Sequence, residues 1–253
     1  MINLKKLSIL ALLVILVTAT RAQEGFQSEK LKHYATLGYN IGAAAPLGLP
    51  NTIRKIKSYS PLFTPSFGYE ATYDLSSKWF VGAGLRLDFK GMKVTDSVQY
   101  FRTEITVGNG GSDDGVFEGD FTGTNATEAN NTYLTMPIYG GYRAGAWNVK
   151  LGMYFAVLLS SKFEGNVSDG YIRKGGSLGE KVLIDHATFD FGDKMRSYDI
   201  GLHAGVEREL TERWQVNLTG QMGFVPLFPS SFKGVGYDLH NMFVTAGVSY
   251  RIW

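Results

Sequence analysis

The sequence of 253 residues contains no cysteine, and it has no long apolar run beyond its first 22 residues. Without cysteine the protein has no disulfide framework and no thiolate chemistry. A membrane-spanning helix needs about 20 consecutive apolar residues, so the rest of the chain holds no candidate for one. Proline is also scarce, at seven residues, and five of these prolines fall in two segments, 46–64 and 226–240, that therefore read as loops.

The first 22 residues have the pattern of a secretion signal. Lys5 and Lys6 form a basic start, residues 7–17 are apolar apart from one serine, and Thr20–Ala22 offers a cleavage site before Gln23. We expect a signal peptide at 1–22 and a single domain at 23–253. Removing Lys5, Lys6 and Arg21 takes the formal charge from +2 to −1, so the mature chain gives no reason to expect nucleic-acid binding.

The remaining chain is dominated by period-two alternation of apolar and polar residues, the pattern of a β-strand with two unlike faces. It is clearest at 198–224, where two arms of roughly 11 residues flank a short turn, and this length suits a tilted strand that crosses a bilayer. The same pattern predicts eight strands in all, at 34–45, 65–75, 79–90, 132–143, 147–160, 198–210, 214–224 and 241–253. Pro137 predicts a bulge or local distortion in the fourth of them.

The connections between these strands alternate in length. Turns of about three residues follow the second, fourth and sixth strands, whereas the segments 46–64, 91–131, 161–195 and 226–240 are long. Outer-membrane barrels show this asymmetry, with short periplasmic turns and long extracellular loops. The sequence therefore predicts an all-β fold, an eight-stranded antiparallel up-and-down transmembrane β-barrel with both termini in the periplasm. Residues 94–107 are rich in β-branched and aromatic side chains and can extend a hairpin beyond the membrane.

The four tryptophans support this orientation. Trp79, Trp147 and Trp214 each directly follow a short turn, and Trp253 is the last residue. We expect all four to form an aromatic girdle at the periplasmic rim. Trp253 is one step out of phase with the lipid-facing residues that end at Ile252, so the pattern does not give it an assembly role.

The face opposite the lipid combines glycine with charge. An eight-stranded barrel is just wide enough for side chains to fill it, and small residues leave room for long charged ones. Six acids and five bases point inward, a balance that lets buried charges pair, so we predict a plugged lumen. The predicted charge network comprises Glu70, Asp74, Arg86, Asp88, Lys90, Arg143, Lys150, Asp199, His203, Glu207 and Arg251, with Glu209 as a further inward acid.

Three other sites can be considered. His203 with Glu207 or Ser160 resembles an acid–base arrangement, but no nucleophile motif accompanies it, so we predict no enzyme activity and no cofactor. Acidic residues in the segment 91–131 (Asp113, Asp114, Glu118 and Asp120) could hold calcium, although their spacing does not match an EF-hand loop and we predict no metal site. The segment 161–195 mixes aromatic, charged and glycine residues, and long patterned loops often bind partners; the alternative is a folded cap over the barrel mouth.

The motifs YLTMPIYGGY, DGYIRKGG, RSYDIGLHAGVE and the chain end FVTAGVSYRIW resemble the PorT-like outer-membrane β-barrel family of Bacteroidota. The resemblance covers essentially the whole mature chain and consists of strand patterns rather than catalytic signatures. It implies an eight-stranded barrel in the outer membrane of a Gram-negative bacterium. For the named member of the family it implies an accessory role in type IX secretion.

We therefore expect a non-enzymatic outer-membrane protein that serves an envelope assembly, related to secretion by this resemblance, or binds through its loops. Its expected partners are outer-membrane lipid and envelope proteins, and the sequence does not fix the oligomeric state. The alternatives are a narrow porin or small-solute channel, a lipid-active outer-membrane enzyme, and a soluble ligand-binding barrel.

Overall fold

A computed structural model describes residues 30–107 and 115–252. The predicted signal peptide, Asp113 and Asp114 of the acidic segment, and Trp253 lie outside these residues. Among the described residues no helix is both long and apolar enough to span a membrane.

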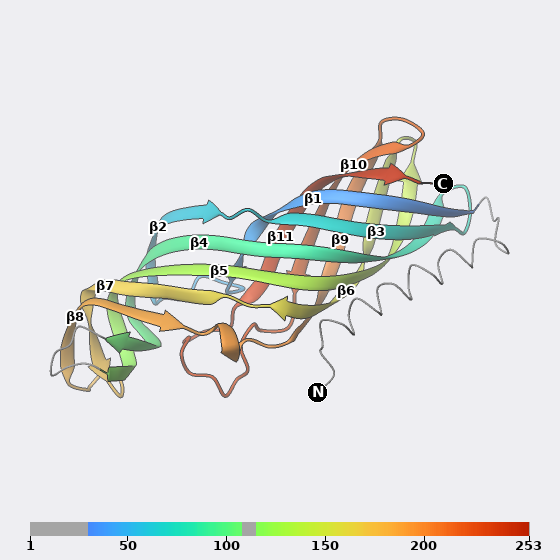
Figure 1. Cartoon of the computed structure of the whole chain (residues 1–253). Helices are drawn as coiled ribbons and strands as arrows, with labels where there is room; N and C mark the ends of the chain where they lie inside the picture. The colour runs from blue at the N-terminus through green and yellow to red at the C-terminus, as the bar shows by residue number, and fades with distance from the viewer. Residues whose placement is uncertain (1–29, 108–114, 253) are drawn as a thin grey trace, which may run out of the picture.

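The described chain forms one antiparallel β-sheet, shown in Figure 1. Its strands are β1 (Leu31–Ala45), β2 (Ile53–Pro61), β3 (Pro65–Asp74), β4 (Trp79–Val107), β5 (Gly115–Ala144), β6 (Trp147–Ser160), β7 (Phe163–Lys174), β8 (Lys181–Asp190), β9 (Tyr198–Glu209), β10 (Trp214–Gly223) and β11 (His240–Arg251). A short 3-10 turn, η2 (Gly192–Lys194), follows β8. Residues 30–107 and 115–252 thus form eleven strands, where eight were predicted.

Part of this sheet pairs as a ring. From β1 the pairing runs through β3, β4, β5, β6, β9, β10 and β11, and β11 pairs with β1 again. Each member therefore has a hydrogen-bonded neighbour on both sides, and closure of this kind removes exposed sheet edges. The antiparallel β-barrel fold expected from the alternation is confirmed.

The three additional strands correct the loop predictions. Segment 46–64 contains β2, segment 161–195 contains β7 and β8, and most of segment 91–131 belongs to β4 and β5. The glycine- and threonine-rich composition resembles a loop, yet each of these strands finds a partner: β2 pairs with β4, β7 with β5, and β8 with β7. Only 226–240 keeps its loop character, with a single bridge between Thr103 and Val235.

The long strands β4 and β5 carry the sheet past the ring and form, with β2, β7 and β8, a projection that we call the extension. In Figure 1, β2, β7, β8 and the far ends of β4 and β5 lie toward the end of the molecule opposite the C-terminus. The extension is thus built from the predicted hairpin at 94–107 together with the segments that composition had assigned to loops.

At Pro137, where a bulge or a local distortion was predicted, the structure has no bulge but an interrupted ladder toward β4. The register with β6 runs without a shift through Pro137↔Tyr154. Toward β4 the pairs Ala83↔Ile138 and Arg86↔Thr135 keep one register on either side of it, with no pair assigned at Pro137 itself. The missing N–H therefore interrupts the ladder toward β4 without adding a residue.

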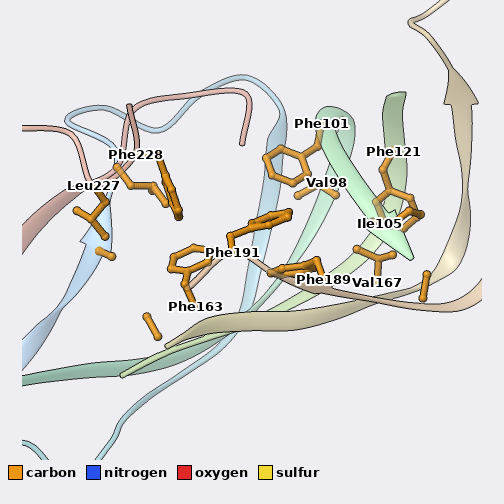
Figure 2. Close-up of a cluster of buried hydrophobic side chains, with 14 of the residues drawn as sticks. Val98, Phe101, Ile105, Phe121, Phe163, Val167, Phe189, Phe191, Leu227 and Phe228 are labelled. Atoms are coloured by element: carbon orange, nitrogen blue, oxygen red, sulfur yellow. The ribbon is translucent and has the colours of Figure 1, made fainter. Parts of the chain in front are cut away.

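The two faces of the ring differ sharply. The outer face exposes large apolar side chains, among them Leu37, Phe67, Val81, Ile138, Leu151, Phe155, Leu202, Leu218 and Val244, whereas the inner face buries charged and amide side chains. A water-soluble protein hides its large apolar residues, whereas a membrane barrel turns an apolar band toward lipid. The main buried hydrophobic cluster lies instead in the extension (Figure 2).

Candidate functional site

The centre of the ring holds one cation between two carboxylates. Nζ of Lys150 on β6 lies 2.7 Å from Glu70 on β3 and 2.5 Å from Glu207 on β9. The hydroxyl of Tyr139 donates to the same Glu70 at 2.6 Å. All four side chains are buried. Strands on opposite sides of the ring are therefore joined through its interior.

Two further groups of ions flank this cluster. Arg86 lies 3.2 Å from Asp88, and the hydroxyl of Ser66 donates to Asp88 at 2.6 Å. Nearer the short turns, Asp74 accepts from Arg143 at 2.5 Å and pairs with Lys32 at 2.9 Å.

The remaining predicted network residues lie in different surroundings. Lys90 has no carboxylate within ion-pair distance among the described residues, and its Nζ lies 5.1 to 5.6 Å from the ring centres of Tyr133, Tyr154 and Phe243. Asp199 accepts from Tyr154 at 2.7 Å and from Asn241 at 2.9 Å.

Three inward residues stand apart from these groups. The ring of His203 stacks on that of Tyr139 at 5.5 Å. Arg251 is only half-buried, and Glu209 is exposed. The structure thus brings Glu70, Lys150 and Glu207 together, but not the whole set.

The interior has almost no free volume at this level. A residual space of about 10 Å³ lies beside Glu70, Lys150 and Glu207, which is about the room of one water molecule. Rings fill the space that glycines leave: a Cβ at Gly82 would lie 2.5 Å from the ring of Tyr139, and one at Gly141 would lie 2.1 Å from Phe80. Tyr139 was missed as a network member, although it shares the inward parity that identified the charged residues.

The three described tryptophans gather at one end of the ring. The register pairs Trp79 with Tyr142 and Trp147 with Arg208 on adjacent strands, and it pairs Trp214 with Tyr250. All three are exposed. The rings of Trp79 and Trp214 each lie 4.9 Å from a neighbouring tyrosine ring, so aromatic pairs mark this rim.

The extension has an aromatic core of its own (Figure 2). Phe191, just after β8, contacts Phe189 at 5.0 Å and Phe232 at 4.9 Å between ring centres, and Phe163 packs edge-on to Phe228 at 5.1 Å. Residues of β7, β8 and the 226–240 loop thereby pack into one body.

Beside this core lies a pocket of about 230 Å³. Its wall is mostly apolar. It is formed by the end of β1, by β2, β4, β5, the start of β7 and the end of β8, and by the 226–240 loop, and it includes Ala43, Ile53, Ile56, Met92, Val94, Phe101, Phe163, Phe191 and Leu239. A polar group interrupts this wall: the Asn125 amide donates to Asp96 at 2.9 Å and to Thr127 at 3.2 Å. Burial raises the pKa of Asp96, and the Asn125 hydrogen bond acts in the opposite direction.

Two of the four acids considered for calcium, Glu118 and Asp120, lie in the described part of the chain, and both are near an arginine. Arg102 lies 2.7 Å from Glu118 and 3.6 Å from Asp120, so these two carboxylates already have a cation. Within the described part of the chain no cluster of His, Cys, Asp or Glu is arranged to hold a metal ion.

The closed ring, with apolar side chains outside and charged side chains inside, agrees with a comparison to known families. The family model for the outer membrane protein beta-barrel domain matches residues 22–229. The chain belongs to this outer membrane protein β-barrel family. Its place is therefore the outer membrane of a Gram-negative bacterium. No curated protein sequence matches the chain.

Solved structures similar to this family member include other outer-membrane proteins. Ail, the attachment invasion locus protein of Yersinia pestis, crystallised with the heparin analogue sucrose octasulfate, is 9% identical over 88% of this chain and 99% of Ail, with a TM-score of 0.35. Neisserial surface protein A is 9% identical over 88% of this chain and 98% of its own, with a TM-score of 0.32. OprG of Pseudomonas aeruginosa is 14% identical over 88% and 94%, with a TM-score of 0.29.

Proposed function

We propose that the ring of eight strands is a closed, non-conducting transmembrane barrel that holds the extension at the cell surface as a binding module. One observation carries this proposal: a folded body with its own aromatic core stands on a ring whose interior is filled by ion pairs. A barrel that only conducted solutes would need an open lumen and no such body.

The proposed orientation places the extension outside and both termini in the periplasm. It is supported by the exposed tryptophans at the end with the short turns, since interfacial aromatics of this kind flank the apolar band of a barrel. The long connections and the extension then face the medium, which is where outer-membrane barrels carry their longer loops.

The alternatives find less support. A narrow porin would require water to pass Glu70, Lys150 and Glu207, where the residual space is about 10 Å³. A lipid-active enzyme would require a nucleophile beside a base at the lipid-facing rim, and His203, the residue first considered as the base, is buried beside Tyr139. The accessory role in secretion implied by the PorT-like resemblance remains a prediction about which partner is bound.

The exposed apolar residues of the extension give the test. Leu183 on β8 is 76% exposed and Leu178 in the turn before it is 99% exposed, and large apolar side chains in such positions are contact candidates. A photo-crosslinking amino acid at position 183, introduced into the full chain in native cells, should yield a discrete protein adduct. The same group at Leu75, in the short turn at the opposite end, is the matched control.

Conductance in planar bilayers completes the experiment. We expect the purified protein to leave bilayer current at its baseline. Stable single-channel steps, or adducts that are equally diffuse from positions 183 and 75, would remove the proposal.

A further inference from the structure

The pocket beside the extension core suggests what the binding module takes. We propose that it binds a small neutral amphiphile, an alkylphenol or a similar compact apolar body that carries one hydroxyl, with the hydroxyl directed at Asn125 and Thr103. This inference deepens the proposed function and rests on it.

The apolar wall of the pocket determines the size and polarity of the main part of the ligand. Met92, Phe101 and Phe163 line the pocket and are buried, so this part of its wall offers only apolar contacts. An engineered cavity of about 150 Å³ lined by apolar side chains holds a benzene molecule. At about 230 Å³, this pocket accommodates an aromatic ring with a short alkyl chain, whereas a folded peptide or a sugar chain would not fit.

The polar group fixes the other end of the ligand. Thr103 is 1% exposed and Asn125 is 5% exposed, and both line the pocket. Thr103 Oγ1 and Asn125 Oδ1 have no hydrogen-bond partner among the described residues. A buried polar atom without a partner is costly, so a ligand that brings a hydroxyl gains by donating to the Asn125 oxygen and accepting from Thr103.

The amide orientation supports a hydroxyl rather than a carboxylate. The Asn125 amide nitrogen is occupied by Asp96 and Thr127, which leaves its oxygen, an acceptor, for the ligand. Asp96 itself is 4% exposed. An anionic ligand would meet acceptor oxygens and a buried carboxyl, and it would therefore be disfavoured.

The entrance lies beside β2. Leu49, Ile56 and Tyr59 line the pocket and are exposed, in contrast to the buried residues at its inner wall. β2 pairs on one side only, with β4. A small molecule therefore reaches the pocket from the medium at this edge of the sheet.

The absence of cysteine allows a direct test in the full-length protein. V94C places the only thiol in the pocket wall, and I56C places one at its entrance. In lipid nanodiscs, saturating 4-butylphenol should slow maleimide labelling of V94C at least tenfold. Butylbenzene, which lacks the hydroxyl, should need at least a tenfold higher free concentration, measured by dialysis, for equal protection. K55C, on the exposed face of β2 and outside the pocket, should not be protected.

The hydroxyl contact has a matched pair of variants. In the V94C background, Thr103→Val removes a pocket hydroxyl and should reduce the preference for butylphenol over butylbenzene at least threefold. Thr52→Val removes another unpartnered hydroxyl that does not line the pocket, and it should leave the preference unchanged.

Equal protection by the two probes would overturn the hydroxyl assignment. Absence of protection at both V94C and I56C would overturn the pocket as a binding site. If protection fails while the adduct at position 183 persists, the ligand inference falls and the proposed function stands. If the bilayer conducts or that adduct is lost, the proposed function falls whatever the probes show.

Discussion

Lys150 shows how charge is tolerated at the centre of the ring. A buried cation is costly unless it is paired and hydrogen-bonded, and here two carboxylates and a tyrosine surround it. The pairing joins β6 to β3 and β9, so one side chain connects strands that are not all neighbours in the ring.

Replacing Lys150 with Met should therefore destabilise the barrel by about 3–5 kcal/mol, because it leaves Glu70 and Glu207 buried without their cation. Urea unfolding in lipid vesicles measures this change. Lys162→Met is the control, since Lys162 is an exposed partner of Glu128 and Glu164, and it should leave the midpoint unchanged. An equal midpoint for the two variants would contradict the role given to Lys150.

Asp96 should make the stability of the extension depend on pH. Burial raises its pKa in the folded state above the ordinary 3.8, so folding favours the protonated carboxyl. The contribution of Asp96 to stability is therefore fully present below pH 3.8 and is lost as the pH rises through its folded pKa. Asp96→Asn should remove this loss, as measured by hydrogen exchange of β4 and β5 between pH 4 and 8. Asp185→Asn, exposed on β8, should retain the wild-type profile.

At this scale the sequence predicts which face a residue occupies but not its partner. Glu70, Lys150 and Glu207 share the inward parity, and their burial follows from alternation alone. Their mutual contact depends on the stagger of three strands around the ring, which period-two alternation does not encode. The pocket group of Asp96, Asn125 and Thr103 was not predicted. Asp96 and Thr103 lie in the predicted hairpin 94–107 and Asn125 in a segment assigned to a loop, and the sequence does not show that these segments meet.

Among the elements, the extension is the part with a conventional core. The ring turns its large apolar residues outward, whereas β7, β8 and the 226–240 loop bury phenylalanines against one another. The two parts are therefore held by different forces, lipid contact and internal ion pairs in one and apolar burial in the other.

Phe191→Ala should consequently loosen the extension and spare the ring. Phe191 is 5% exposed, and removing a buried phenylalanine costs about 3–5 kcal/mol. Limited proteolysis should then cut between residues 162 and 195, while the ring fragment still migrates as a folded band on unheated gels. Leu183→Ala, at an exposed site of the same body, should remain uncut. Heat-labile migration of the whole Phe191 variant would show instead that the two parts fold as one.

Strands were predicted correctly where one face of the strand is apolar and the other is polar. The predicted ranges 147–160 and 214–224 agree with β6 and β10 to within one residue. β2 and β7 were missed because they contain lysine with serine or glycine, and their strand conformation depends on a partner strand rather than on propensity. β8 contains several β-branched and apolar residues, and it was missed because the whole segment 161–195 was assigned to a loop.

For the whole molecule, the proposed orientation makes a prediction that single thiols can test. L178C lies in the turn between β7 and β8, and K78C lies in the short turn before β4. A membrane-impermeant maleimide added to intact cells should label L178C and leave K78C unlabelled until the outer membrane is permeabilised. The cysteine-free wild type gives the background. Labelling of K78C alone on intact cells would reverse the orientation.

The length of β4 has a consequence for where the module operates. Beyond Phe89 the strand continues to Val107 with one irregularity between Val98 and Phe101, and at about 3.3 Å per residue this is roughly 60 Å along its path. With the proposed orientation, we expect the pocket at Val94 and Thr103 to lie outside the bilayer, on the side of the medium. A ligand then enters the pocket from the surrounding water. Its binding therefore depends on the ligand concentration in the water and not on the ligand concentration in the membrane.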